Sequence, residues 1–134
     1  MIGMVLVTHG RLAEELRSAM EHVVGSQRNV DTVCIGPEDD IDNCRAEIEQ
    51  CITRCDTGDG VVLTDMFGGT PSNLGMTFLE TNQIEVITGV NLPMLIKLAS
   101  LRSSSDLLAV AREMRDHGRT AIWVASDLLR GDKP

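Results

Sequence analysis

Short apolar segments alternate with longer amphipathic segments along this chain, and that alternation limits the possible folds more than any other feature. The short segments are rich in Val, Ile and Thr, which favours buried strands. They cover residues 3–8, 31–36, 61–65, 84–89 and 120–125. Strands that alternate with helices predict an α/β fold, an open and doubly wound sheet that is mainly parallel and flanked by helices.

We expect the first four strands to lie in the order 2-1-3-4, as in flavodoxin-like sheets. Residues 120–125 (TAIWVA) would then form a fifth strand at the edge of the sheet. Both faces of this strand are apolar, and Trp123 is the single Trp of the chain. An unpaired apolar edge invites pairing with another chain, so the segment favours a homodimer.

Local signals predict several helix ends and one buried helix face. Thr70, before Pro71, is expected to be an N-cap, while Gly25 and Gly118 are expected to end helices. Three cysteines at helical spacing are expected to be buried apolar residues rather than zinc ligands or members of disulfides. These are Cys44, Cys51 and Cys55, which share one predicted helix face with Ile41, Ile48 and Ile52.

Composition excludes several classes of function. The 134 residues and 43% hydrophobic content fit one domain over residues 1–134. A net charge of −8 and 2% aromatic residues argue against nucleic acid, which requires clustered cations and stacking side chains. No apolar segment approaches the roughly 20 residues that span a bilayer, and the start lacks a basic signal-peptide region. We therefore expect a cytoplasmic protein that is not an integral membrane protein, with no metal and no cofactor.

Two stretches place polar side chains where predicted strands end. His9 follows the first strand in VLVTHG (5–10), and Asp65 ends the third in VVLTDMFGGTPSN (61–73). In the expected order these strands are neighbours, so both side chains would face one crevice. A carboxylate that accepts from one ring nitrogen would leave the other nitrogen free as a nucleophile.

An anion site is expected beside this pair. Helices that begin after Gly10 and after Thr70 would direct free N–H groups into the crevice. Gly68 and Gly69 would allow backbone to approach an oxyanion, and Thr70 and Ser72 would add hydroxyl donors. This combination favours phosphoryl transfer through a phosphohistidine. The residues alone leave a second interpretation open, in which His9 is structural and Asp65 only forms a turn.

Three motifs resemble one known family. Three stretches look like the signatures of the mannose-family enzyme IIA domain. In chain order they are V-T-H-G, L-T-D-M-F-G-G-T-P-S-N and I-T-G-V-N-L-P-M-L (87–95). That domain belongs to the bacterial phosphoenolpyruvate-dependent sugar phosphotransferase system, and the resemblance covers residues 2–127. It implies that His9 accepts phosphate from the phosphocarrier HPr and passes it to an enzyme IIB, that Asp65 orients His9, and that the Thr70 loop contacts the phosphoryl group. It also implies a homodimer in which the last strand crosses to the partner.

The sequence departs from the transporter members at two positions, where Arg11 and Phe67 stand in place of frequent Trp residues. We expect Arg11 to be a solvated residue at a helix start, although contact with phosphate is an alternative. No fused IIB segment follows, so we expect IIB to be a separate chain, with recruitment to a membrane permease complex left open. A regulatory phosphoprotein that signals by phosphorylation-dependent binding is the alternative function. The related component that serves dihydroxyacetone kinase fits the G-G-T-P-S-N loop less well.

The remaining candidates carry weaker signals. His22 and His117 are expected to lie on helix surfaces and to have no catalytic role. Met66, Met76 and Met94 are expected to fill the core, although Met66 and Phe67 could instead form an apolar rim for partner docking.

Overall fold

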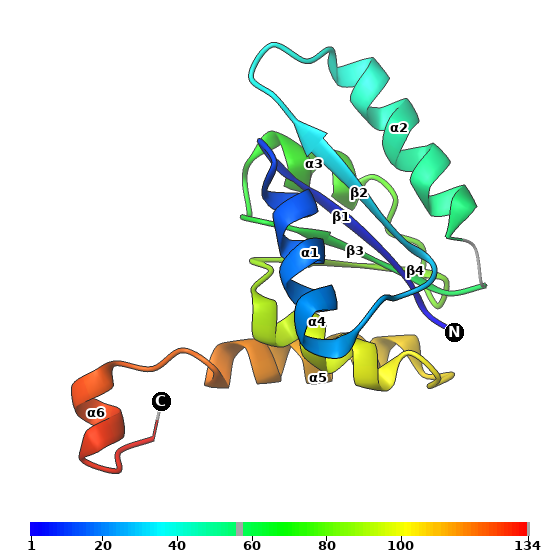
Figure 1. The fold of residues 1–134 in the computed structure, drawn as a ribbon. Coiled ribbons are helices and arrows are strands. Elements are labelled where there is room, and N and C mark those ends of the chain that lie inside the picture. Colours follow the sequence, from blue (N-terminus) through cyan, green and yellow to red (C-terminus); the bar gives the residue numbers. More distant parts are fainter. Residues whose placement is uncertain (56–57, 134) are drawn as a thin grey trace.

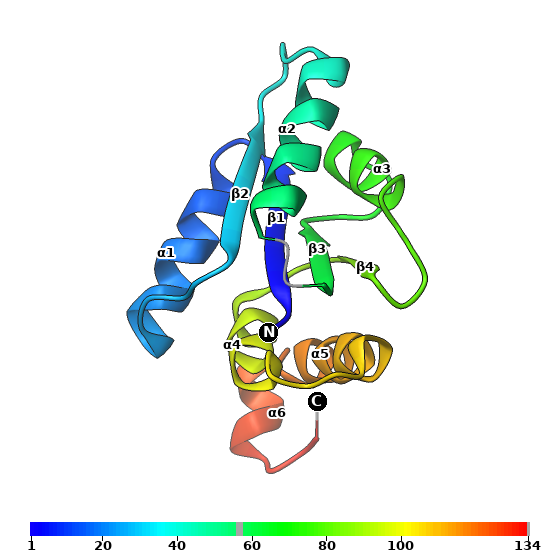
Figure 2. The same cartoon turned by 90° about the vertical axis from the view of Figure 1, so that its right-hand side faces the viewer.

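The computed structural model describes residues 1–55 and 58–133 and contains one sheet with helices on both sides (Figures 1 and 2). Its strands are β1 (Gly3–His9), β2 (Val30–Ile35), β3 (Gly60–Thr64) and β4 (Ile84–Thr88). Its helices are α1 (Leu12–Val24), α2 (Ile41–Arg54), α3 (Thr70–Met76), α4 (Leu92–Leu101), α5 (Leu107–Thr120) and α6 (Ala125–Leu129). Among the described residues, no helix is both long enough and apolar enough to cross a bilayer.

The sheet is parallel throughout and its order is β2-β1-β3-β4, which confirms the predicted topology. The order reverses between β1 and β3, so their carboxyl ends form the switch point where ligands bind in such folds. The two strands pair from Gly3 with Gly60 to Val7 with Thr64. That register brings the residues after Val7 and Thr64 to one edge of the sheet.

The strands are buried on both faces, and alternate residues enter two different cores. Met4, Leu6 and Leu63 pack with α1, α4 and α5, whereas Val5 and Val62 pack with α2 and α3. Figure 2 shows these two helix layers on either side of the strands. Both faces of β1 are therefore fixed by packing, which leaves its end as the part that can carry chemistry.

The prediction of a strand at 120–125 is wrong for the single chain. Thr120 ends α5, and α6 begins at Ala125, with irregular backbone between them. The N–H of Ala121 still donates to the carbonyl of His117, at 3.1 Å, which continues the helical pattern. A strand requires a neighbour to pair with, and this segment leaves the body of the molecule at the far end of α5 (Figure 1).

Helix α5 does not end at Gly118, contrary to expectation. The Gly118 carbonyl accepts from Asn91 Nδ2 at 3.1 Å, and a Cβ there would lie 3.0 Å from Met94 Cε. Glycine is present because α4 approaches α5 closely, and not because the helix stops. At Gly25, by contrast, φ is +85° and the residue caps α1 as predicted.

Of the predictions for helix α3, the cysteine helix and the methionines, some are confirmed and others are wrong. Gly69 is the N-cap of α3 and Thr70 is its first helical residue, so the predicted N-cap lies one position too late. Cys44, Cys51, Cys55 and Ile48 are buried, but Ile41 is exposed. Of the three methionines, Met94 is buried, whereas Met66 and Met76 lie at the surface. These two are not core residues, because Met66 lies on the loop after β3 and Met76 is the last residue of α3.

Candidate active site

His9 and Asp65 meet at the carboxyl ends of β1 and β3. His9 is the last residue of β1, and Asp65 follows directly after β3. Because both strands are parallel neighbours, their ends bring the two side chains to the same edge. The sequence predicted this meeting from an assumed strand order, and the geometry confirms that the two residues are in contact.

One carboxylate oxygen of Asp65 makes two hydrogen bonds with His9. Oδ2 lies 2.8 Å from the ring Nδ1 and also accepts the backbone N–H of His9 at 3.0 Å. The other oxygen, Oδ1, accepts the N–H of Met66 at 3.1 Å. An ionised carboxylate can only accept, so Nδ1 carries a proton, and in the neutral imidazole Nε2 keeps its lone pair.

Exposure differs sharply within the pair. The His9 side chain is 49% exposed, whereas that of Asp65 is 13% exposed. Burial alone would raise the pKa of Asp65, but hydrogen bonds from the backbone and ring of His9 hold that pKa below its usual value. The site therefore combines a shielded anion with an accessible imidazole.

Two glycines shape the backbone around the imidazole. Gly10 has φ +55° and directs the chain from β1 into α1, and Gly68 has φ +88° in the loop before α3. Gly69 has an ordinary φ but lies against the ring, since a Cβ there would be 2.7 Å from His9 Cε1. The observed position of the His9 ring therefore requires that residue 69 has no side chain.

The loop hydroxyls behave differently from one another. Thr70 is exposed and lines a cavity of about 280 Å³ beside His9. Ser72 is fully buried, and its Oγ lies 3.8 Å from Met76 Sδ. Of the two, the Thr70 side chain is the one that reaches the space next to the imidazole.

A third strand end contributes to the cavity, and the sequence analysis missed it. The loop after β2 supplies Gly36, Pro37 and Asp39 to the cavity lining, and Ile41 and Cys44 of α2 complete that side. The signal was available, because an order of 2-1-3-4 places the end of β2 beside the end of β1. The Oδ2 of Asp39 accepts the N–H of Gly36 at 2.7 Å, which fixes this carboxylate to its own loop.

The buried Thr8 is a second residue that the sequence analysis missed. Its Oγ1 accepts the N–H of Ala13 at 2.7 Å and so fixes the first turn of α1 directly after His9. Arg11 is 80% exposed and pairs with Glu14 at 3.0 Å, as expected for a solvated residue at a helix start. His22 and His117 lie exposed on α1 and α5, away from the switch point.

Apolar side chains surround the imidazole at the surface. Phe67 and Met66 are 74% and 56% exposed, and Ile41 is exposed on the other side of the cavity. Exposed apolar groups of this size beside a polar site are typical of protein docking surfaces. Met66 and Phe67 are thus exposed, as the alternative expectation of an apolar rim requires, and their use in partner docking stays a prediction.

Comparison with known proteins gives consistent matches. The family described as PTS system fructose IIA component matches residues 3–114. The PTS system mannose-specific EIIAB component of Escherichia coli K12 is 32% identical over 127 residues, which cover 90% of this chain and 39% of that protein. The PTS system fructose-specific EIIA component of Bacillus subtilis is 26% identical over 131 residues, covering 96% and 90% of the two chains. This chain thus spans about two fifths of its Escherichia coli relative.

Solved structures show the same fold. The mannose/sorbose specific IIA subunit from Enterococcus faecalis superposes with a TM-score of 0.82 at 27% identity, covering 92% of this chain and 93% of that one. The phosphotransferase component EIIA from Streptococcus agalactiae gives a TM-score of 0.85 at 24% identity, covering 94% and 98%. The second likeness supports the architecture alone, because its identity is low.

Proposed function

This chain belongs to the PTS system fructose IIA component family, and from that premise we propose that it carries phosphoryl groups on His9. The phosphoryl group comes from phosphorylated HPr: the donor P–N bond breaks as a bond forms to Nε2 of His9. An enzyme IIB then takes the group from His9 in the same way. The protein would act in the cytoplasm as a phosphotransferase with a phosphohistidine intermediate.

The observation that carries the proposal is the 2.8 Å contact between Asp65 Oδ2 and His9 Nδ1 on a ring that remains half exposed. The carboxylate keeps the Nδ1 proton in place, so the nucleophilic lone pair is on the nitrogen that a donor can reach. When Nε2 becomes phosphorylated, the ring gains positive charge, which the anionic Asp65 stabilises.

The phosphoryl oxygens would lie among the residues expected from the sequence. Gly69 keeps a side chain away from Nε2, and Thr70 offers a hydroxyl to the same cavity. Gly10 and Gly68 give the adjoining backbone its turns of positive φ. Ser72 would act through its backbone N–H in the first turn of α3, because its hydroxyl is buried.

The partners would dock on the apolar groups around His9. Phe67, Met66 and Ile41 form a surface that both HPr and IIB could cover in turn. We propose that IIB is a separate polypeptide, which fits the Bacillus subtilis relative named as an EIIA component alone. Binding to such a IIB would recruit the protein to a membrane permease complex.

We also propose a homodimer. The segment 121–124 exposes Ile122, Trp123 and Val124 at 68%, 42% and 63%. Large apolar groups on an extended segment favour burial against a second copy. Sedimentation equilibrium tests this directly, and a monomer at all accessible concentrations would contradict it.

Incubation with phosphoenolpyruvate, enzyme I and HPr, followed by intact mass, tests the phosphocarrier role. We expect one phosphate on the wild type, labile in acid and stable in alkali, and none on His9→Ala. His22→Ala and His117→Ala serve as matched controls and should gain the phosphate normally. Addition of cognate IIB should then remove the phosphate. Phosphorylation without transfer to any IIB would favour the regulatory alternative, and an acid-stable adduct would contradict the His9 assignment.

A further inference from the structure

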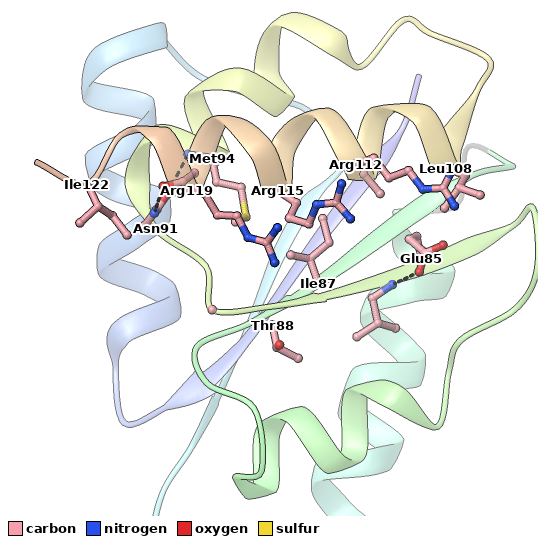
Figure 3. Close-up of a pocket in the computed structure, with 14 residues that line it drawn as sticks. Glu85, Ile87, Thr88, Asn91, Met94, Leu108, Arg112, Arg115, Arg119 and Ile122 are labelled. Carbon is pink, nitrogen blue, oxygen red and sulfur yellow. Dashed lines mark hydrogen bonds between the residues drawn. The ribbon is translucent and has the colours of Figure 1, made fainter. Parts of the chain in front are cut away.

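Arg11 supplies the cation of the segments that surround the imidazole of His9. These segments follow β1, β2 and β3, and they cover residues 9–15, 36–42 and 65–72. Each of the three contains carboxylates, and Arg11 is the only Lys or Arg among them. The arginines of α5 line a separate groove beside β4 (Figure 3), and β3 lies between β4 and the strand that carries His9. A negative group on His9 would therefore have Arg11 as its cationic neighbour from these segments.

A phosphoryl group would add negative charge to a site that already holds carboxylates. Such a group carries about two negative charges near neutral pH. Asp65 contacts the ring of His9, and Asp39 lines the same cavity. The Thr70 hydroxyl beside the ring is a neutral donor, as are the backbone N–H groups at the start of α3. A guanidinium would add the missing positive charge, and it binds phosphate through two parallel hydrogen bonds.

The backbone places Arg11 within reach of His9. The two residues are two positions apart, so their Cα atoms are separated by at most about 7 Å, which an extended Arg side chain can span. Arg11 is the N-cap of α1 and thus lies at the edge of the sheet where His9 ends β1. Between them, a Cβ added at Gly10 would meet no atom within 4 Å. The space beside Gly10 is therefore open, and the guanidinium can move through it.

In the unphosphorylated protein Arg11 bonds to Glu14 instead. Its Nη2 lies 3.0 Å from Oε2 of Glu14, and the two side chains are 80% and 50% exposed. An exposed pair of this kind contributes little to stability. Glu14 lies in the first turn of α1, where the helix dipole favours a carboxylate even without an arginine partner. Arg11 can therefore leave Glu14 at little cost in free energy.

We propose that Arg11 binds the phosphoryl group on Nε2 of His9, and that it exchanges Glu14 for the phosphoryl oxygens when His9 becomes phosphorylated. When the group passes to the acceptor, Arg11 returns to Glu14. This inference rests on the proposed phosphocarrier function and adds a phosphoryl-binding residue to it. Because the transporter members often carry Trp at this position, the contact is a property of this chain and not of the whole family.

The equilibrium of phosphoryl transfer between HPr and this protein tests the contact. Its constant compares the free proteins before and after transfer, so an effect of Arg11 on docking cannot change it. Arg11→Gln should shift the equilibrium towards phosphorylated HPr by roughly 10-fold at low salt, and by less at high salt because the site is exposed. Arg11→Lys keeps the charge but not the planar fork, so its shift should be smaller. Arg17→Gln, further along α1, is the matched control and should give the wild-type constant.

Glu14→Gln tests the exchange in the opposite direction. Loss of the competing carboxylate should shift the equilibrium towards the phosphorylated form of this protein, because Arg11 no longer has to leave a partner. Glu15→Gln is the matched control, since it removes the same charge from the same turn without releasing Arg11. We expect Glu14→Gln to shift the equilibrium by roughly 3-fold more than Glu15→Gln. In the Arg11→Gln background the two glutamate changes should have equal effects, because no guanidinium is left to release.

NMR of the arginine side chains gives a second readout that reports the contact directly. The Nε–H resonance of Arg11 is assigned by its loss in Arg11→Lys. In the wild type we expect this resonance to shift on phosphorylation and its proton to exchange more slowly with water. The resonance of Arg17 should stay where it is.

The outcomes separate the contact, the exchange and the phosphocarrier function. An equilibrium that is unchanged in Arg11→Gln, or shifted as much by Arg17→Gln, would overturn the contact and leave the phosphocarrier function intact. Equal effects of Glu14→Gln and Glu15→Gln in the wild-type background would overturn the exchange. A wild type that accepts no phosphate from HPr would overturn the phosphocarrier function and this inference together.

Discussion

Each end of the sheet carries one polar side chain that is hydrogen-bonded to neighbouring segments, but the two side chains are used in opposite ways. At the carboxyl end, His9 is 49% exposed and one of its ring nitrogens is held by Asp65. At the amino end, Arg102 is 4% exposed and donates to three oxygens. A group that is buried and fully bonded can only stabilise, whereas a group that is held at one atom and exposed at another can react.

Arg102 ties together segments that are far apart in the sequence. It donates to the carbonyls of Ile2 at 2.8 Å and Asn29 at 3.0 Å, and to Gln27 Oε1 at 3.2 Å. Its own carbonyl accepts the N–H of Ile2 at 2.7 Å. These bonds connect the end of α4 to the starts of β1 and β2, at the amino end of the strands and opposite His9. We therefore expect a change at Arg102 to lower the stability of the fold without slowing phosphoryl transfer, and changes around His9 to slow phosphoryl transfer.

The largest effect is expected from Arg102→Met. The change keeps much of the apolar stem but removes every donor, which leaves the buried carbonyl of Ile2 without its side-chain partner. We expect the free energy of unfolding to fall by about 3 kcal/mol, measured by urea denaturation. The rate of phosphorylation by HPr should stay at the wild-type value where the variant is folded.

Arg45→Met is the matched control for that experiment, because Arg45 makes only an exposed pair with Asp42 at 3.5 Å. It should cost under about 1 kcal/mol. If Arg102→Met were as stable as this control, Arg102 would not stabilise the fold as described. If the folded variant were phosphorylated slowly, the amino end of the sheet would also affect phosphoryl transfer.

The next effect is expected at the other end, from Asp65→Ala. Loss of the carboxylate frees the His9 ring to rotate and to exchange tautomers, so phosphoryl transfer should slow by roughly 10- to 100-fold. Rapid-quench measurement of transfer from phosphorylated HPr gives the rate.

Asp39→Ala provides the comparison, since Asp39 lines the same cavity but accepts the N–H of Gly36 and not a hydrogen bond from the ring. It should change the rate much less. Equal slowing by the two substitutions would mean that local negative charge, and not the orientation of His9, determines the rate.

A smaller effect is expected from Gly69→Ala. The added Cβ would lie 2.7 Å from His9 Cε1, so the ring must move away from its position on Asp65. A shift of this size should slow transfer by roughly 10-fold and leave the urea midpoint nearly unchanged. Gly60→Ala, where the nearest atom would be 3.8 Å away, is the control. Normal transfer in Gly69→Ala would show that the ring position tolerates movement.

Much of this organisation was predictable, and the failures have a common cause. The strand order and the meeting of His9 with Asp65 follow from alternating apolar segments, because parallel strands place their ends together. Residues 120–125 have the composition of a strand, but a strand needs a neighbour to pair with, and in the part of the chain that the structure describes no strand lies beside them. Arg102 gave no signal, since two of the three oxygens it binds are backbone carbonyls, which any sequence would have, and the third is on Gln27, far away in the sequence.

The smallest predicted effect concerns pH and isolates the Asp65 carboxylate. Its pKa in the native protein lies below the usual value, because the donors from His9 outweigh the effect of burial. In the unfolded chain Asp65 titrates near its ordinary pKa of about 3.9, so the unfolded state binds the proton more readily. The ionised carboxylate therefore adds stability above that pH, and the contribution is lost as pH falls through the native pKa. Asp65→Asn keeps the shape and an acceptor oxygen but does not titrate. We expect the wild type to exceed Asp65→Asn in unfolding free energy by less than about 1 kcal/mol at pH 6, and the gap to shrink towards pH 3. Asp31, whose pKa is also lowered, with Arg54 as a partner, is present in both proteins and cancels. A gap that stays constant or widens in acid would show that the Asp65 carboxylate is not stabilised by His9.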